Sequence, residues 1–155
     1  MRDAATATPL VLCAVVLVVA AASSLLPVSP VEAILVALSA TAPPSLLLPV
    51  AVLATLGHMA AKIVVYLGSR KTTPVVPARQ RAALERVRAL LLRRRRVRAL
   101  TVLLSAFGGL PPFYLVTVCC GVLRLPLRDF IIVGTVGRGL RFGALALLPR
   151  LFGAM

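Results

Sequence analysis

Two arginines and one glutamate are the residues of this sequence best suited to bind an ionic ligand. Arg138 and Arg141 lie three residues apart in an apolar stretch, so a helix would place them on adjacent turns. A guanidinium group binds phosphate or carboxylate with two parallel hydrogen bonds, and the pair therefore predicts a receptor for an anionic headgroup. Glu32 could pair with one arginine and take up a proton when a ligand displaces it, which makes it the candidate coupling or gating acid. A structural Glu–Arg pair is the alternative interpretation.

A second apolar stretch carries two more ionisable residues. Thr55, His58, Lys62 and Tyr66 share one helical face, and we expect this polar stripe to face protein or water. His58 is a second candidate for coupling or gating, because imidazole changes charge near physiological pH, or else a hydrogen-bonded packing residue. Lys62 is a third candidate substrate ligand, or else a side chain that extends to the nearer membrane surface.

The remaining residues argue against enzymatic chemistry. The sequence has four acids in 155 residues and shows no nucleophile–base set, acidic metal cluster or glycine-rich phosphate loop. Its three cysteines, Cys13, Cys119 and Cys120, lack metal-ligand spacing. We therefore expect no enzyme activity, no catalytic residue, no metal and no cofactor.

The elements that carry these residues must lie in a membrane, because a mean hydropathy of +1.01 excludes an ordinary soluble domain. We expect one all-α integral membrane domain over residues 1–155, with about three spanning helices and two re-entrant hairpins. Its segments are a spanning helix at 10–26, a re-entrant segment at 29–44, a spanning helix at 44–68, a basic loop with an amphipathic helix at 70–98, a re-entrant segment at 99–124 and a spanning helix at 129–152. A cleaved signal peptide is the alternative for the first segment.

The basic loop predicts the orientation of the chain. Between Arg70 and Arg98 the sequence has eleven Lys or Arg residues and one acid, Glu85, out of a net charge of +14 for the whole chain. Such a loop stays on the cytoplasmic side, which also places the N-terminus in the cytoplasm and the protein in the inner (plasma) membrane. Anionic lipid is the partner expected for these charges, rather than nucleic acid. The sequence leaves open whether copies associate into a homo-oligomer.

Two proline doublets interrupt the apolar stretches. Pro43-Pro44 and Pro111-Pro112 each remove two backbone donors, so a lipid-exposed helix should not continue through them. We interpret them as the turns of two hairpins that enter from opposite faces, as an inverted repeat requires. A single kinked span over residues 99–123 is the alternative for the second doublet.

The last apolar segment combines charge with small residues. We expect Asp129 to cap its helix. A central arginine costs about 2.5–3.5 kcal/mol on insertion, so Arg138 and Arg141 need partners. Four glycines offer close helix contacts, including a GxxxG match: Gly134, Gly137, Gly139 and Gly143.

Several blocks of the sequence resemble the DedA family, also called the SNARE-associated or VTT-domain family. They are the residues 29–32, 57 with 66–70, 110–113 with 120–130, and 137–142, the last reading Gly-Arg-Gly-Leu-Arg-Phe. The resemblance covers about residues 28–148 and implies two opposed re-entrant hairpins. It also implies movement of undecaprenyl phosphate or phospholipids between leaflets, in some members with proton coupling, and it matches Glu32 to the family's hairpin acid.

The chain departs from the family pattern at two places. Many members have an aspartate where this chain has His58, and an arginine near the hairpin proline where it has Pro112, Phe113 and Tyr114. Arg138 and Arg141 could replace that arginine. We therefore expect a transporter or flippase for a lipid or other phosphate-bearing anion. A structural membrane protein that supports envelope assembly is the alternative, and a small-molecule exporter is the third.

Overall fold

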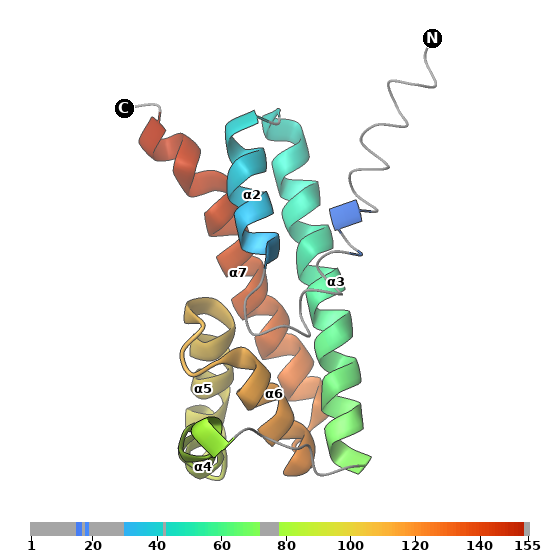
Figure 1. Cartoon of the computed structure of the whole chain (residues 1–155), viewed down its shortest axis with the longest axis vertical. Coiled ribbons are helices and arrows are strands. Elements are labelled where there is room, and N and C mark those ends of the chain that lie inside the picture. The colour runs from blue at the N-terminus through green and yellow to red at the C-terminus, as the bar shows by residue number, and fades with distance from the viewer. Residues whose placement is uncertain (1–14, 17, 19–29, 42, 72–77, 154–155) are drawn as a thin grey trace. The chain divides into compact units, whose positions relative to one another are not determined.

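The computed structural model describes residues 15–16, 18, 30–41, 43–71 and 78–153, and within them the regular structure is entirely helical. The elements are α2 (Pro30–Thr41), α3 (Pro44–Lys71), α4 (Ala78–Leu91), α5 (Arg95–Gly108), α6 (Phe113–Val122) and α7 (Leu127–Gly153) (Figure 1). The all-α class is confirmed for these residues. The expected span at 10–26 lies outside the described residues, except for three of its positions.

Two of the described helices are long and apolar enough to cross a membrane. They are Ser45–Lys71 within α3, with a mean hydropathy of 1.8, and Leu127–Leu147 within α7, with a mean hydropathy of 1.5. These helices correspond to the spanning segments expected at 44–68 and 129–152. Both begin or end a few residues beyond the expected bounds.

The first proline doublet separates α2 from α3, as predicted. The N–H of Leu46 donates to the carbonyl oxygen of Pro43 over 3.0 Å, which closes the first turn of α3. Pro44 occupies the first helical position, where its missing donor would have no helical partner anyway. The doublet therefore ends one helix and also begins the next.

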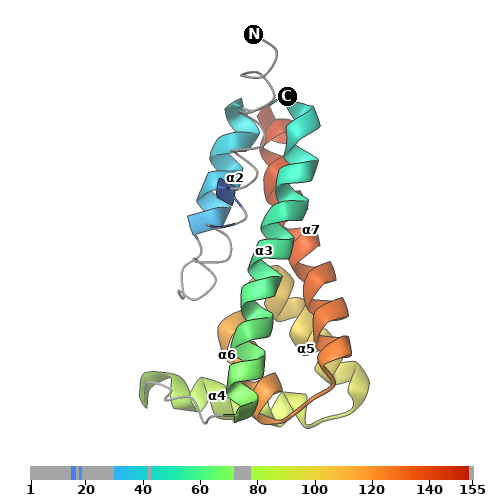
Figure 2. The same cartoon turned by 90° about the vertical axis from the view of Figure 1, so that its right-hand side faces the viewer.

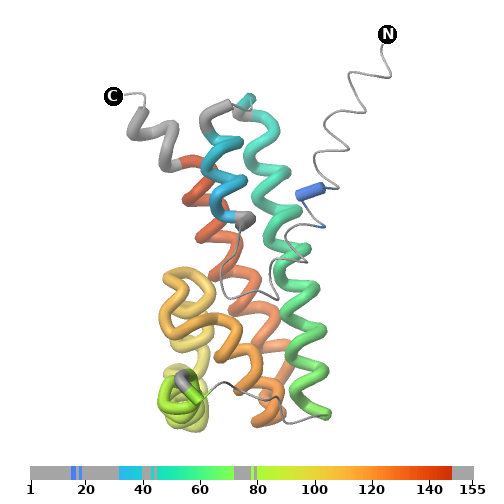
Figure 3. The backbone as a smooth tube through the Cα atoms, viewed as in Figure 1, coloured from blue at the N-terminus to red at the C-terminus, as the bar shows by residue number. Residues whose placement is uncertain are grey.

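The second doublet separates α5 from α6, so the alternative of one kinked helix over 99–123 is wrong. Gly109 adopts the left-handed conformation at φ 79° and donates its N–H to Ser105 over 3.0 Å, which ends α5. The hydroxyl of Ser105 then donates to the carbonyl oxygen of Pro111 over 2.5 Å. Helix α6 starts directly after Pro112, and the chain turns back along α5 (Figure 3).

The chain divides into two compact units, and the first comprises Met1–Ala60 with Gly139–Met155. Here α2 runs antiparallel to the beginning of α3, and the second part of α7 packs against both (Figures 1 and 2). Their apolar side chains meet in one core, whose buried members include Leu35, Leu47, Val50, Ala54, Phe142 and Ala146.

The second unit is Ala61–Arg138, and in it α4 packs against α5 and α6. Val87 and Leu91 are buried on the inner face of α4, whereas Arg81, Arg86 and Arg88 are exposed. In the basic loop, the structure thus has a helix with a buried apolar face and an exposed basic face. The basic run continues into the first turn of α5, which starts at Arg95 rather than at the expected Ala99, because arginine is a good helix former.

Two glycines allow close helix contacts in this unit. A Cβ atom at Gly137 would lie 2.7 Å from the Cβ of Ala106 on α5, and one at Gly121 would lie 2.7 Å from the Cβ of Ser69 on α3. The GxxxG pair is looser, because a Cβ at Gly139 would lie 4.0 Å from Thr55 and one at Gly143 would have no neighbour within 4 Å. On α7 the close helix contact is thus made at Gly137 and not at the GxxxG pair.

The prediction that Asp129 caps α7 is wrong. The N–H of Phe130 donates to the carbonyl oxygen of Pro126 over 3.2 Å, so the helix starts before Asp129, which lies inside its first turn. The carboxylate oxygens of Asp129 instead accept hydrogen bonds from Arg95 Nη2 at 3.1 Å and Nε at 3.3 Å. A bidentate arginine contact therefore replaces the expected cap.

Candidate functional site

Lys62 lies inside the second unit rather than at its surface. Lys62 is 2% exposed, and its Nζ atom lies 5.4 Å from the centroid of the Tyr114 ring. An ammonium group over an aromatic face is attracted by the negative charge of the π system. The alternative that Lys62 extends to the membrane surface is not what the structure shows.

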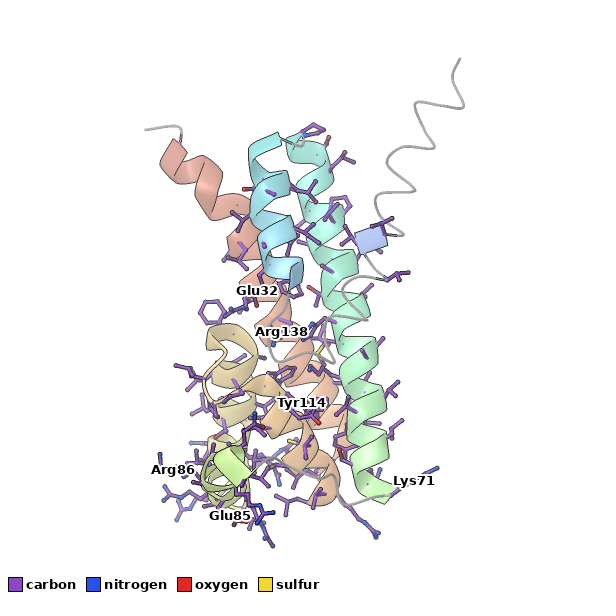
Figure 4. All side chains as sticks on the ribbon, in the orientation of Figure 1. Glu32, Lys71, Glu85, Arg86, Tyr114 and Arg138 are labelled. Carbon is purple, nitrogen blue, oxygen red and sulfur yellow. The ribbon has the colours of Figure 1, made fainter. Side chains whose placement is uncertain are left out.

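Arg138 makes the corresponding contact with the neighbouring ring. It is 6% exposed, and its Cζ atom lies 4.9 Å from the centroid of the Phe113 ring. Phe113 and Tyr114 are the first two residues of α6, directly after the second proline doublet. Two adjacent rings thus receive two cations, one from α3 and one from α7. Tyr114 and Arg138 are labelled in Figure 4.

Sequence reasoning missed these two aromatic residues as members of the site. The available signal was their position, because they stand where many members of the family that the sequence resembles have an arginine. A ring cannot replace a guanidinium group as an anion ligand, but it can hold a cation that arrives from another helix.

The two cations of this unit act on one another electrostatically. Lys62 and Arg138 lie over the adjacent rings of Tyr114 and Phe113, so their two positive charges are held near one another. Like charges repel strongly where the surroundings have a low dielectric constant. An anion bound next to both side chains would relieve this repulsion and would bind more tightly because of it.

Phe113 also belongs to a stack of aromatic rings. Its ring centroid lies 5.9 Å from that of Phe130, with an angle of 11° between the planes, and Phe130 lies 5.3 Å from Tyr66 at 22°. The Cζ atom of Arg70 lies 5.9 Å from the Tyr66 ring at the far end. The aromatic stack thus joins α6, α7 and α3, and an arginine contacts each end.

The hydroxyl of Tyr66 fixes one end of the aromatic stack. It donates to the carbonyl oxygen of Leu125, in the connection between α6 and α7. That carbonyl lies beyond the end of α6, where helical partners are lacking. Tyr66 therefore ties α3 to the connection that precedes α7.

The first unit contains the Glu32–Arg141 pair. Nε and Nη2 of Arg141 donate to the two carboxylate oxygens of Glu32, each over 2.7 Å. The side chain of Glu32 is 27% exposed and that of Arg141 is 25% exposed, so the pair is largely removed from solvent. The pairing predicted for Glu32 is present, and Arg141 rather than Arg138 is its partner.

His58 is buried in the same unit. It is 2% exposed, and its ring meets that of Phe142 edge to face at a centroid distance of 5.8 Å. The whole predicted polar stripe is turned into protein, because Thr55, Lys62 and Tyr66 are also no more than 5% exposed. The expectation that the stripe faces protein is confirmed.

The predicted site residues thus fall into two groups. Lys62 and Arg138 belong to the second unit, and Glu32, His58 and Arg141 belong to the first. Pro43, Pro44, Pro111 and Pro112 stand at the two helix breaks, as expected. Among the described residues, no group of three or more His, Cys, Asp or Glu side chains could hold a metal ion.

Comparison with known proteins finds no similar protein. None of the family models matches the sequence, and searches of curated proteins and of solved structures return no match either.

Proposed function

We propose that this chain is an integral membrane protein that moves a lipid or another phosphate-bearing anion between leaflets, with Lys62 and Arg138 as its anion ligands. The observation that carries the proposal is the burial of both cations against two adjacent aromatic rings, on two helices of membrane-spanning length. Ionisable side chains inside a membrane are costly and are generally retained for function. The resemblance to the DedA family points to the same class of activity.

The positions of the two cations along their helices support this reading. Lys62 precedes Lys71 by nine residues, about 14 Å of helix, and Arg138 follows Leu127 by eleven residues, about 16 Å. Both distances are close to half of the roughly 30 Å hydrocarbon core. A ligand at these side chains would therefore stand near mid-membrane, where transporters bind their substrates.

The second proline doublet fits a re-entrant hairpin. Helices α5 and α6 measure only about 21 and 15 Å, too short for either to span. Arginines flank the hairpin at Arg95 and at Arg124, and the positive-inside rule places both on the cytoplasmic side. The turn at Pro111-Pro112 would then lie within the membrane, next to the rings that receive the cations.

The first doublet takes a different position in this proposal. Because α3 is about 42 Å long, Pro44 would lie at or beyond the outer surface when Lys71 is on the cytoplasmic side. Glu32 precedes Thr41 by nine residues on α2, which returns about 14 Å into the membrane. Glu32, rather than the first proline doublet, would then lie deep in the membrane.

The ion pair of the first unit supplies the proposed coupling device. An anion that competes for Arg141 would release Glu32, and a carboxylate that loses its cation at membrane depth tends to take up a proton. The proposal therefore includes proton coupling through Glu32, with His58 as the second candidate group.

Leaflet-resolved lipid movement in proteoliposomes tests the proposal. The full-length protein is reconstituted with a trace of fluorescent phosphatidylglycerol, and an impermeant quencher reports the outer-leaflet fraction over time. Loss of one charged hydrogen-bond donor costs about 1.5–3 kcal/mol, so Arg138→Ala and Lys62→Ala should slow movement at least about tenfold. Lys62→Arg should retain more activity than Lys62→Ala.

Arg128→Ala is the matched control, because Arg128 is an exposed arginine on the same helix as Arg138. Its rate should equal that of the wild type. An absence of protein-dependent movement for every anionic lipid tested would contradict transport and favour the structural alternative. Equal rates for Arg138→Ala and Arg128→Ala would contradict the assignment of the ligands.

A further inference from the structure

We infer that a cavity in the second unit binds one anionic phospholipid of the cytoplasmic leaflet, at a place separate from Lys62 and Arg138. The cavity has a volume of about 230 Å³ and lies between the first half of α5, the end of α6 and the beginning of α7. This inference rests on the proposed function only for the orientation of the chain in the membrane.

The walls of the cavity are mostly apolar, and its charged residues carry one net positive charge. Val102, Cys120 and Phe130 are buried apolar side chains that contribute to the walls. Arg95, Arg98 and Asp129 are the charged lining residues, and two arginines against one aspartate leave a single excess charge. A phosphodiester has one negative charge and is attached to apolar chains, so a phospholipid matches both properties.

Arg98 is the residue that would contact the phosphate. Arg95 already donates to both carboxylate oxygens of Asp129, at 3.1 and 3.3 Å. Arg98 is half-buried in the wall of the cavity. A guanidinium group with an apolar wall beside it binds phosphate more tightly than one in water, because the surrounding dielectric constant is lower.

The size of the cavity identifies which part of the ligand it admits. Its 230 Å³ is below the range of about 300–1,000 Å³ typical for whole drug-sized ligands. Only the phosphate and the adjoining part of a lipid would enter. The rest would lie along exposed apolar side chains on α5 and α7, namely Leu100, Leu104, Ile132 and Val136, each more than half exposed.

The ligand is a lipid rather than a free anion for two reasons. Inorganic phosphate would leave the apolar walls without a partner, whereas burial of apolar surface stabilises binding of a lipid. The arginines also lie in the basic segment that the proposed orientation places at the cytoplasmic headgroups, where anionic lipids are already concentrated.

Native mass spectrometry of the full-length protein in detergent tests the inference. With equal amounts of dioleoyl-phosphatidylglycerol and dioleoyl-phosphatidylcholine present, the wild-type protein should retain one phosphatidylglycerol. Arg98→Gln should weaken retention about tenfold, as expected for loss of a charge-assisted contact. Ala99→Trp should weaken it similarly, because a large ring on this lining residue would fill the cavity.

Arg96→Gln is the matched control, because Arg96 is an exposed arginine two residues away that does not line the cavity. It should retain the lipid as the wild type does, and circular dichroism should show equal helix content in all variants. Retention at the wild-type level by both Arg98→Gln and Ala99→Trp would overturn the inference. Equal retention of phosphatidylcholine, or displacement of the lipid by inorganic phosphate alone, would overturn the assignment of the ligand.

The result is distinguishable from that of the transport assay. Arg138→Ala should keep the bound phosphatidylglycerol, because Arg138 does not line the cavity. Specific retention without any lipid movement would support this cavity and contradict transport. Lipid movement without Arg98-dependent retention would support transport and overturn the cavity.

Discussion

Arg141 holds both carboxylate oxygens of Glu32, through Nε and Nη2 and over 2.7 Å each. The two residues are 109 positions apart in the sequence, so the pair joins α2 to α7 across most of the chain. Removing one member leaves the other in a largely buried place without its counter-charge. Loss of the partner of a buried charge lowers the free energy of unfolding considerably. Substitution of either residue is therefore a direct test of the fold of the first unit.

Glu32→Gln should destabilise the protein by about 1–3 kcal/mol, because the amide keeps the shape of the side chain but not its charge. Thermal unfolding in detergent measures the change. Glu85→Gln is the control, since Glu85 lies 4.0 Å from Arg88 in an exposed pair, and it should change stability by less than about 0.5 kcal/mol. Equal effects of the two substitutions would show that the Glu32 pair contributes no more than a surface pair.

Glu32→Gln, compared with a double variant, distinguishes a structural role of Glu32 from a role in proton coupling. If the pair only holds α2 to α7, a variant with both Glu32→Gln and Arg141→Gln should recover stability and keep its lipid movement. If Glu32 couples movement to protons, Glu32→Gln should abolish the dependence of the rate on a pH gradient in proteoliposomes.

Gly137→Ala should destabilise the second unit by about 1–3 kcal/mol, because the new Cβ would lie 2.7 Å from that of Ala106 and 3.1 Å from the carbonyl oxygen of Leu103. Gly143→Ala on the same helix is the control. It has no neighbour within 4 Å, and alanine favours a helix over glycine by about 1 kcal/mol. Unfolding midpoints should move in opposite directions, and Ala106→Gly should restore part of the loss. A Gly137→Ala variant as stable as Gly143→Ala would contradict this packing of α5 on α7.

Tyr66→Phe should cost about 1–2 kcal/mol, because the carbonyl oxygen of Leu125 would lose the hydroxyl that donates to it while the aromatic ring remains in its stack. The chain has two tyrosines, and Tyr114→Phe is the matched comparison because its ring would still lie under Lys62. The midpoint of thermal unfolding should be clearly lower for Tyr66→Phe than for Tyr114→Phe. The reverse order would mean that the link from Tyr66 to Leu125 does not stabilise the protein.

Cysteine labelling tests whether the first proline doublet lies at the outer membrane surface and the second lies within the membrane. In a variant without Cys13, Cys119 and Cys120, a cysteine at Ser45 should react with an impermeant maleimide from the outside, and one at Gly109 should be protected from both sides. A cysteine at the exposed Arg96 should react only after the membrane is permeabilised. Equal protection at Ser45 and Gly109 would contradict the proposed hairpins.

Much of the local structure could be predicted from the sequence. The proline doublets, the alternation of apolar stretches and the amphipathic pattern in the basic loop depend on neighbouring residues, and these features appear in the structure as helix breaks and helix faces. The burial of the polar stripe on α3 was also predictable, because one helical face carries all four residues.

The contacts between helices could not be predicted in the same way. Asp129 resembled a helix cap, yet Arg95 binds it from 34 residues away. The pairing of Phe113 with Arg138 and of Tyr114 with Lys62 depends on how α6 meets α3 and α7, which no local pattern encodes. Arg141 rather than Arg138 pairs with Glu32 for the same reason, although spacing alone favoured neither.

The aromatic stack of Phe113, Phe130 and Tyr66 has a consequence for how this sequence can change over time. Each ring contacts the next, and an arginine contacts each end, so no one position can be substituted in isolation without loosening its neighbours. Related sequences should therefore vary these positions together. Where a smaller side chain replaces Phe130, compensating changes are expected at Phe113 or Tyr66, and the residue at the position of Arg138 should change along with them.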